Sequence, residues 1–323
     1  MDKKPKILVV GSFMMDLISR TSKVPGEGET ITGWSFSTAS GGKGANQAVQ
    51  AALLGADVTM VGKVGNDVFG AHMLDSLRSA GVKVEHVIKD KQNASGVGNI
   101  TLEVKEGLKT RNRILILPGA NMALTANEVE FLKEDILNYD IVMLQNEIPA
   151  GVNDAIVGYA GARGIPVMLN PAPSRPIGED ILAKLDYISP NEYEAYDLTG
   201  IKIEAGSDGV DLDTVRSAAD AFLGKGVKNV IITLGSNGVV LANRSKFIYR
   251  PCIDVVEVID PTAAGDSFVG AFCTGICRGM SEESAIEFAS HAAAITVSRL
   301  GAQPSLPAYG EVIELMESVK STT

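Results

Sequence analysis

The chain has 323 residues, of which 45% are hydrophobic and 21% are charged, and its formal net charge is −10 at pH 7. A chain of this size and apolar content can bury a large core, and its negative charge argues against binding to nucleic acid or to an anionic membrane. No apolar run approaches the roughly 18 residues of a membrane span, and no small-residue cleavage site follows the first apolar run, so we expect a cytoplasmic protein with small-molecule partners.

Apolar runs of strand length alternate with helical patterns along the chain. The predicted strands lie at residues 7–10, 58–61, 141–144, 166–169, 187–189 and 230–234. The predicted helices lie at residues 45–54, 67–80, 126–137, 152–162, 212–224, 265–278 and 282–298. A capping box from Thr125 to Glu128 marks the start of the third helix. Strands that are apolar throughout and alternate with helices predict an α/β fold, with a mostly parallel sheet flanked by helices on both faces.

Two segments interrupt this alternation, approximately residues 16–39 and 95–117. Both have short strand patterns with turn residues and no helix, which predicts a small antiparallel sheet with an exposed face. Open α/β sheets bind their ligands outside the carboxyl ends of the strands. We therefore interpret the two segments as a β-sheet lid over that edge of a single domain that spans residues 1–323.

The stretch IDPTAAGDSF, residues 259–268, places a carboxylate at the start of a helix, behind very small side chains. Asp266 alone could be an ordinary first-turn acid that interacts with the helix dipole. Residues 262–265 include nothing larger than threonine, however, so backbone N–H groups can come close to a bound anion. A carboxylate beside an anion site indicates a group-transfer reaction.

A second glycine-rich stretch, SGGKGANQA at residues 40–48, precedes another helix. It is not a Walker A loop, because Ser37 stands where the first glycine should be and Gly44 follows Lys43. The loop offers backbone donors, the ammonium of Lys43 and the amide of Asn46, a set that suits sugar hydroxyls. The alternative is a simple glycine turn that enters a helix.

Polar residues also follow four of the predicted strands. Asp16 and Glu147 come after the first and third strands, where a carboxylate can accept hydrogen bonds from hydroxyls. Asn191 and Glu194 lie three apart at a helix start and could orient water on a metal ion, or act only as cap and first-turn acid. The stretch ITLGSNGVV, residues 232–240, is either a hairpin turn or one wall of a nucleotide pocket.

Cysteine and histidine patterns predict neither a disulfide framework nor a transition-metal site. The three cysteines include no Cys-x-x-Cys pair, and Cys273 and Cys277 lie four apart on a predicted helix, as small core residues do. The three histidines are widely separated. The sequence therefore predicts no zinc or iron site.

Four stretches together resemble the ribokinase family of carbohydrate kinases, the pfkB type. They are GKGANQ at residues 42–47, NEYE at 191–194, TLGS at 233–236 and AAGD at 263–266, and the resemblance extends from about residue 6 to 305. It implies a three-layer ribokinase-like fold with a small β lid, which often forms a homodimer contact. It also implies transfer of the γ-phosphoryl group of ATP to a sugar or nucleoside hydroxyl.

The resemblance assigns roles to individual residues. Asp266 matches the catalytic base, and Ala263, Ala264 and Gly265 match the anion hole. The sugar-binding positions are Met14, Asp16, Gly42, Lys43, Gly44, Ala45, Asn46 and Glu147. The ATP-binding positions are Asn191, Thr233, Leu234, Gly235, Ser236, Asn237, Gly238, Gly265 and Ser290. Asn191 and Glu194 match the pair that orders Mg²⁺ through water, and a K⁺ site matches Asp260, Thr262, Thr296, Arg299, Gly301 and Ser305.

Three positions depart from the family pattern. Pro261 replaces a frequent threonine, which should be harmless because proline only fixes φ and removes one donor. Ser290 stands where some ribokinases have a histidine near the adenine. Met14 replaces the asparagine expected near the sugar 2-hydroxyl in ribose kinases, and a thioether packs well against a bare methylene group.

These observations predict an ATP-dependent pentose kinase that phosphorylates the 5-hydroxyl of 2-deoxyribose or ribose, with Met14 favouring deoxyribose. The alternatives are a kinase for another sugar or a nucleoside, and a non-catalytic sugar-binding regulator. A Rossmann dehydrogenase is excluded, because the first strand is followed by Gly11 alone and not by Gly-x-Gly-x-x-Gly.

Overall fold

A nine-stranded sheet is the centre of the structure, a computed structural model that describes residues 4–105, 110–206, 209–254 and 256–322. Its strand order is β13-β12-β11-β10-β9-β8-β1-β4-β5. The strands are β1 (Lys6–Val10), β4 (Asp57–Gly65), β5 (Lys83–Asp90), β8 (Ile141–Gln145), β9 (Val167–Asn170), β10 (Tyr187–Ile188), β11 (Asn229–Thr233), β12 (Val239–Asn243) and β13 (Phe247–Arg250). All pairs from β5 to β11 are parallel, whereas β12 and β13 add an antiparallel edge.

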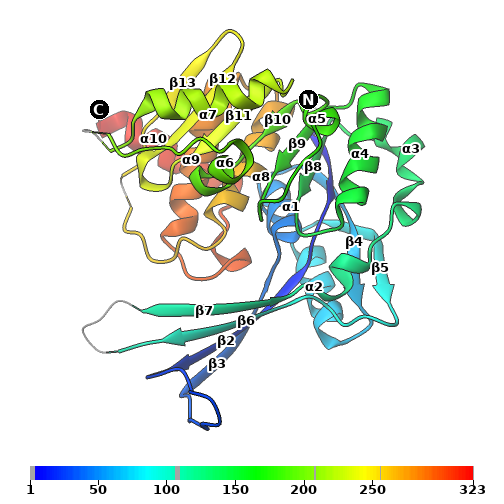
Figure 1. The fold of residues 1–323 in the computed structure, drawn as a ribbon, viewed down its shortest axis with the longest axis vertical. Coiled ribbons are helices and arrows are strands. Elements are labelled where there is room, and N and C mark those ends of the chain that lie inside the picture. Colours follow the sequence, from blue (N-terminus) through cyan, green and yellow to red (C-terminus); the bar gives the residue numbers. More distant parts are fainter. Residues whose placement is uncertain (1–3, 106–109, 207–208, 255, 323) are drawn as a thin grey trace.

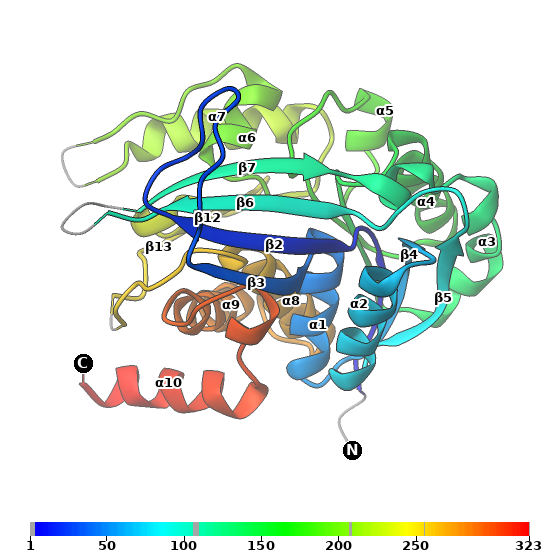
Figure 2. The same cartoon turned by 90° about the horizontal axis from the view of Figure 1, so that it is seen from below.

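Helices cover both faces of this sheet (Figures 1 and 2). The helices against one face are α1 (Lys43–Leu53), α2 (Val68–Ser79), α8 (Ala264–Cys277), α9 (Glu282–Val297) and α10 (Tyr309–Thr322). The helices against the other are α3 (Leu132–Asp135), α4 (Ala150–Arg163), α5 (Glu179–Leu182), α6 (Glu192–Thr199) and α7 (Leu212–Gly224). The fold is thus the predicted three-layer α/β arrangement.

The central strands contain continuous apolar runs because each one contributes to two cores. In β1, Ile7 and Val9 pack into the core with α1 and α8, whereas Leu8 and Val10 pack into the core with α4 and α7. Successive side chains of a strand point to opposite faces, so a sheet buried on both sides needs apolar residues at every position. This explains why these strands could be predicted from composition alone.

Several elements escaped prediction. β5 and β13 lie at the edges of the sheet, where exposed positions carry polar residues and interrupt the apolar runs, whereas β12 has a buried apolar run that was predicted only as part of a possible hairpin. α10 packs against α9 at the surface and is likewise mixed in composition. Among the described residues no helix is long and apolar enough to cross a membrane.

The prediction of one continuous helix at residues 126–137 is wrong. The segment forms a 3₁₀ turn at Asn127–Val129, the short α3, and a second 3₁₀ turn at Ile136–Asn138. The capping box is present, since the Glu128 N–H donates to Thr125 Oγ1 at 3.4 Å and the Thr125 N–H donates to Glu128 at 2.9 Å. Its first N–H groups bond to carbonyls three residues back, the 3₁₀ pattern, and Lys63 of β4 ties Glu128 to the sheet.

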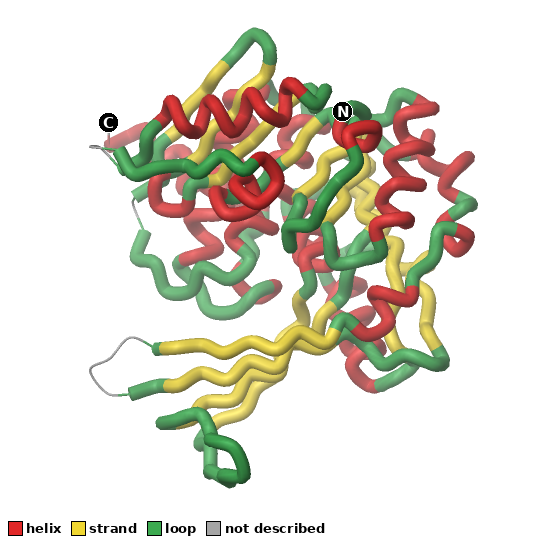
Figure 3. The backbone as a smooth tube through the Cα atoms, viewed as in Figure 1, coloured by secondary structure: helices red, strands yellow, loops and turns green. Residues whose placement is uncertain are grey.

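A separate four-stranded sheet projects from the body of the molecule (Figure 3). Its strands, in spatial order, are β3 (Ser35–Gly41), β2 (Met14–Thr21), β6 (Val97–Glu103) and β7 (Arg111–Leu117). The expectation of a wholly antiparallel sheet is wrong, because the central pair β2 and β6 is parallel. β2 follows the carboxyl end of β1 and β6 follows that of β5, so both leave the same edge of the main sheet in the same direction.

Candidate active site

A cavity of about 220 Å³ lies at the carboxyl ends of the parallel strands. Its lining residues are Lys43, Asn170, Ala172, Ser189, Asn191, Glu194, Thr233, Pro261, Ala263, Ala264, Gly265, Asp266 and Val269. They come from the ends of β9, β10 and β11 and from the starts of α1, α6 and α8. Ligands of open α/β sheets bind at this edge, and most of the lining residues were predicted from sequence.

The turn before α8 has an unusual backbone. Ala263 has φ 63°, the one left-handed non-glycine residue in the described part of the chain. Such a conformation costs of the order of 1–3 kcal/mol and is kept where the surroundings impose it, often at functional sites. Gly265 has open space where a Cβ would stand, so a ligand can reach the backbone there. Because the first N–H groups of a helix have no intrahelical acceptor, the turn can bind an anion.

The carboxylate of Asp266 faces α1 and not its own helix start. It is only 6% exposed, and it accepts hydrogen bonds from Asn46 Nδ2 at 2.9 Å and from Gln47 Nε2 at 3.1 Å. Ala263 is the N-cap residue of α8, and no side chain caps this end. Asp266 is therefore not a helix cap. It joins the two glycine-rich stretches, which lie about 220 residues apart in sequence.

Lys43 brings a positive charge to the same cavity. Burial alone would lower the pKa of its ammonium, but Asp266, Glu147 and Glu194 raise it, and the net shift is upward. The Lys43 N–H donates to Glu147 Oε2 at 2.9 Å, which fixes the start of α1. Gly42, with φ 93°, has no room for a side chain, since a Cβ would lie 2.7 Å from the Met14 nitrogen. Because the three nearby carboxylates raise its pKa, the Lys43 ammonium stays protonated over a wide pH range.

Glu147 and Asp16 are brought close, but their surroundings differ. One Glu147 oxygen accepts from Ser12 Oγ as well as from the Lys43 N–H, so Glu147 also anchors the glycine loop. Asp16 lies in β2 between Gly98 of β6 and Gly41 of β3, and a Cβ on Gly98 would lie 2.4 Å from its Oδ1. Burial and the nearby charge of Glu147 raise the pKa of Asp16 to about 6. Asp16 is a carboxylate available to accept hydroxyl hydrogen bonds.

Met14 shares a face of β2 with Asp16, since the two are separated by one residue. Met14 is 4% exposed yet belongs to neither hydrophobic core, whereas its neighbour Met15 is part of the core with α1 and α8. The Met14 side chain is thus buried on the face that carries Asp16. The strand geometry is compatible with contact between Met14 and a ligand bound to Asp16.

Asn191 and Glu194 form a reciprocal cap at the start of α6. Asn191 Oδ1 accepts from the Glu194 N–H at 2.8 Å, and Glu194 Oε2 accepts from the Asn191 N–H at 2.9 Å. The interpretation as cap and first-turn acid is therefore correct, and both side chains also line the cavity. Burial raises the pKa of Glu194, and the Asn191 N–H and the charge of Lys43 oppose that rise only in part.

Of the other predicted nucleotide positions, Thr233 and Gly265 line the cavity. Residues 234–238 connect β11 to the antiparallel β12 through a 3₁₀ turn at Gly235–Asn237, so the hairpin interpretation is correct. Leu234 is buried in the core, which leaves only its backbone for a ligand. Ser290 is partly buried in α9 and does not line the cavity.

The predicted potassium residues gather beside the turn before α8. Asp260 accepts from the Thr262 N–H and the Gly301 N–H, both at 3.0 Å, which joins the loop before α8 to the loop after α9. Burial would raise the pKa of Asp260, but these donors and the Thr262 hydroxyl lower it. The hydroxyls of Thr296 and Ser305 bond to backbone carbonyls, and the Arg299 guanidinium pairs with Glu311.

A K⁺ ion held here, mainly by backbone carbonyl oxygens, remains a prediction from the sequence. The carboxylate and hydroxyl oxygens of these residues are the kind of ligand that suits a hard cation. Among the described residues no group of three or more histidine, cysteine, aspartate or glutamate side chains could hold a metal ion.

Sequence reasoning missed three polar residues of the site. Asn170 and Ser189 line the cavity, and Gln47 bonds to Asp266 from beneath it. Asn170 directly follows a predicted apolar strand run, the same signal that identified Asp16 and Glu147, whereas Ser189 is the last residue of the run predicted at 187–189. Gln47 is the last residue of the GKGANQ stretch. Its position in a predicted helix did not indicate which way its side chain points.

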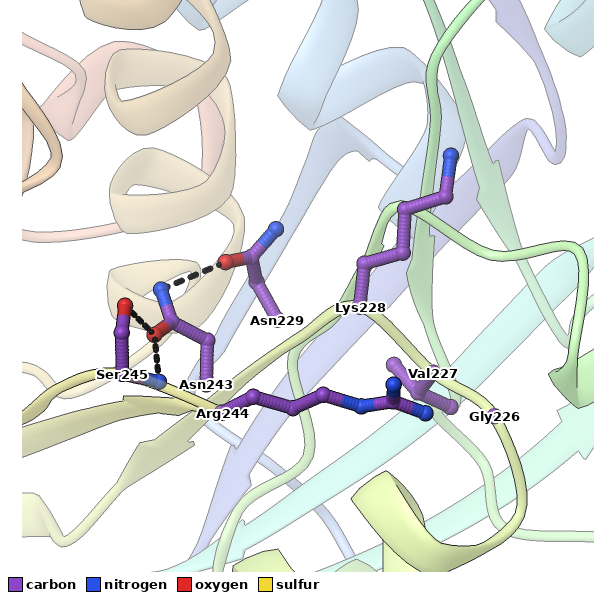
Figure 4. Close-up of a pocket in the computed structure, with 7 residues that line it drawn as sticks. All are labelled: Gly226, Val227, Lys228, Asn229, Asn243, Arg244 and Ser245. Carbon is purple, nitrogen blue, oxygen red and sulfur yellow. Dashed lines mark hydrogen bonds between the residues drawn. The ribbon is translucent and has the colours of Figure 1, made fainter.

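A larger hollow of about 440 Å³ lies at the opposite edge of the main sheet (Figure 4). Residues 226–229 and 243–245 line it, and its polar groups bond to one another: Asn243 Nδ2 donates to Asn229 Oδ1 at 3.0 Å, and Ser245 donates to Asn243. None of these lining residues has a carboxylate. We place the candidate active site in the smaller cavity, where charged groups, an open backbone turn and the strand ends meet.

Comparisons with known proteins agree with this geometry. The model of the pfkB family carbohydrate kinases matches residues 4–309. The chain is 38% identical to a ribokinase of Bacillus subtilis (strain 168), over 96% of this chain and 99% of that protein. It is 34% identical to a deoxyribokinase of Salmonella typhimurium (strain LT2), again over 96% and 99%. The structure of Arabidopsis thaliana ribokinase complexed with ribose and ATP superimposes with a TM-score of 0.89 at 32% identity, covering 98% of this chain and 99% of that one.

Proposed function

Because the chain belongs to the pfkB family of carbohydrate kinases, and is thus a sugar kinase that transfers a phosphoryl group to an alcohol, we propose that it phosphorylates the 5-hydroxyl of 2-deoxyribose or ribose with ATP. One observation carries the proposal: the buried carboxylate of Asp266 lies directly beside the open backbone turn at residues 263–265. A base and an anion site in contact are what in-line phosphoryl transfer needs.

In this proposal Asp266 accepts the proton of the attacking sugar hydroxyl. The N–H groups of the first turn of α8 stabilise the negative charge that develops on the transferred phosphoryl group, without reorganising during the reaction. Lys43, whose charge is stabilised by three carboxylates, adds a positive charge to the same cavity. Positioning and charge stabilisation account for most phosphoryl-transfer catalysis.

The sugar would lie between β2 and the start of α1. Asp16, Glu147, Lys43 and Asn46 offer acceptors and donors for hydroxyls, with residues 42–45 as the backbone wall. The ATP phosphates would approach Asn191 and the turn before α8, and the base and ribose would extend along Thr233 and residues 234–238 toward Ser290. Asn191 and Glu194 would hold Mg²⁺ through water, and that ion supplies positive charge to the phosphates.

We assign the four-stranded sheet the role of a lid and of a homodimer contact. The sheet and the residue before β3 expose large apolar side chains, namely Trp34, Phe36, Ile114, Leu115, Ile116 and Leu117, each at least half exposed. Clusters of exposed apolar residues mark interaction surfaces. A cytoplasmic location remains a prediction from the sequence.

A coupled assay of ADP release with ribose, 2-deoxyribose, fructose and adenosine tests the proposal. Turnover should be highest with one of the two pentoses. Highest turnover with fructose or adenosine would instead indicate a kinase for another sugar or a nucleoside. Pentose binding by calorimetry without any ADP release would indicate a non-catalytic sugar-binding protein.

A further inference from the structure

We propose that Gln47 is the positioning residue for Asp266, and that a chain of buried amides fixes which oxygen of the carboxylate accepts the proton. This inference rests on the proposed function of Asp266 as the base. Its observations are three buried amide side chains beneath the cavity, those of Gln47, Gln145 and Asn170.

Gln47 connects the carboxylate to the main sheet. Its Nε2 lies 3.1 Å from Asp266 Oδ1 and 3.2 Å from Asn170 Oδ1, so one amide group donates to both. Its Oε1 accepts a hydrogen bond from Gln145 Nε2 at 2.7 Å. Gln47 is on α1, Gln145 ends β8 and Asn170 ends β9, so the three amides join a helix to two adjacent strands.

The direction of this chain is determined at Asp266 and at Asn170, whereas Gln145 Oε1 is buried without a hydrogen-bond partner among the described residues. An ionised carboxylate can only accept hydrogen bonds, so Gln47 must turn its NH₂ group toward Asp266. Asn170 Nδ2 donates to the Ser189 carbonyl at 2.8 Å, which leaves Asn170 Oδ1 to face Gln47. Gln145 then supplies the donor that Gln47 Oε1 needs. Each amide thus holds its neighbour in the orientation that presents a donor to Asp266.

The two oxygens of Asp266 are consequently not equivalent. Oδ1 is held by Gln47, a neutral donor locked on both sides by other amides. Oδ2 is held by Asn46, whose own Oδ1 is buried without a hydrogen-bond partner among the described residues. Asn46 is also a predicted sugar-binding residue, so a sugar hydroxyl can take its place at Oδ2. We assign proton acceptance to Oδ2 and orientation to Oδ1.

The test uses Gln47→Met, which keeps most of the side-chain volume and removes the donor. Loss of one hydrogen bond to a charged group should lower kcat roughly 10- to 100-fold, with the KM for pentose and for ATP changed less than about twofold. In an Asp266→Asn background the same substitution should lower kcat by less than about threefold, because residues that act as one unit are non-additive. An equal fold loss in both backgrounds, or a rise in KM that accounts for the loss, would overturn the inference.

Gln50→Met is the matched control. Gln50 is on the same helix, is equally buried, and bonds to the Pro307 carbonyl and the Ser267 hydroxyl, not to Asp266. It should lose stability as Gln47→Met does while kcat falls less than about threefold. A similar loss of kcat in both variants would mean that any buried amide of α1 is needed, and would refute the specific role.

Gln145→Met provides a second route if Gln47→Met does not fold. It leaves Gln47 in place but removes the donor to Gln47 Oε1, so a smaller loss confined to kcat is expected, and an unchanged kcat would contradict the chain of amides. The experiments distinguish failure of the proposed role of Asp266 as the base from failure of the proposed role of Gln47. Full activity of Asp266→Asn overturns both, whereas an inactive Asp266→Asn with full activity of Gln47→Met overturns only the inference about Gln47.

Discussion

At the scale of single residues, the site is built from side chains that the fold holds in costly states. Asp266 is buried with no ion pair among the described residues, Asp16 is buried beside another carboxylate, and Ala263 has a left-handed backbone. Each of these features reduces stability when considered alone. Asp266 and Ala263 line the cavity of the candidate active site, and Asp16 lies close to Glu147. We therefore expect substitutions at these residues to change activity and stability in different ways.

Asp266→Asn tests the base directly. The amide has nearly the same shape but cannot accept a proton, and positioned bases typically contribute about 10²–10⁴-fold to the rate. We expect kcat to fall by that factor while calorimetry still detects binding of sugar and ATP. Near-normal turnover would remove Asp266 from the mechanism.

Asp16→Asn should stabilise the protein and weaken sugar binding. The pKa of Asp16 is raised from 3.8 to about 6, so the folded state binds its proton more tightly than the unfolded state does. That contribution favours folding below about pH 4 and is lost as the pH rises through 6. At pH 8 the variant should gain of the order of 1–3 kcal/mol in free energy of unfolding, measured with urea.

Measuring the free energy of unfolding of both proteins at several pH values provides the control for Asp16→Asn. Near pH 4.5 native Asp16 is largely protonated, so the stability difference between the two proteins should shrink there. A difference that does not depend on pH would contradict a raised pKa. For the unmodified enzyme, kcat/KM for the sugar should fall as the pH decreases through about 6, because a protonated Asp16 has lost part of its capacity to accept hydroxyl bonds.

Met14→Asn tests the choice between the two pentoses. If Met14 packs against C2, bound ribose buries a 2-hydroxyl that lacks one partner, which costs about 1–3 kcal/mol. Deoxyribose should then be preferred roughly 5-fold or more, with Asp16 reducing the effect. Asparagine restores a donor and an acceptor, so the ratio of kcat/KM should shift toward ribose, whereas Met14→Leu should leave it nearly unchanged. An identical ratio in all three proteins would show that Met14 does not face C2.

At the scale of elements, the loops around α8 act as one unit. The loop before α8 and the loop after α9 are joined through Asp260 and Gly301, and the Ile259 and Asp260 N–H groups both donate to the Val297 carbonyl. A cation held by these loops would stabilise the turn at residues 263–265 without touching substrate. Its effect should therefore appear in kcat.

We expect K⁺ to raise kcat roughly 5-fold or more over Na⁺ at the same ionic strength, within the usual range of coupling between two sites. Asp260→Asn should abolish the difference between the two salts, because it removes the one carboxylate of the site. Equal rates in KCl and NaCl for the unmodified enzyme would argue against a potassium site.

At the scale of the whole molecule, the four-stranded sheet is separate from the main sheet and projects from the body of the molecule (Figure 3). β7 exposes Ile114, Leu115, Ile116 and Leu117 in succession, whereas the main sheet buries its apolar residues on both faces. A stable interface of about 800 Å² per partner would cover such a surface. A second copy of the chain is the occupant that we propose.

Leu117→Lys should therefore convert a dimer into a monomer, as measured by analytical ultracentrifugation. Leu137→Lys is the matched control, since Leu137 has the same exposed fraction of 52% but lies in the 3₁₀ turn after α3. The control should remain dimeric. A monomer before any substitution, or equal dissociation of both variants, would contradict a dimer through this sheet.

The sequence by itself determined the layered α/β architecture and most of the cavity. Strand and helix periodicities are local, and strands buried on both faces contain continuous apolar runs, as at residues 7–10 of β1 and 141–144 of β8. The carboxyl ends of parallel strands share one edge, so polar residues after such strands could be assigned to one site before any contact was known. Lys43, Asn191, Glu194, Thr233 and Asp266 indeed line one cavity.

Only the tertiary structure decided which partners these side chains have. No local pattern could reveal that Asp266 bonds to Asn46 and Gln47 across about 220 residues, or that Gly98 leaves the space for Asp16. The parallel pairing of β2 with β6 likewise follows from where two distant strands leave the main sheet. Such features depend on long-range packing, in which the orientation of one side chain is set by neighbours from other elements, and the linear sequence does not encode that information in any local period.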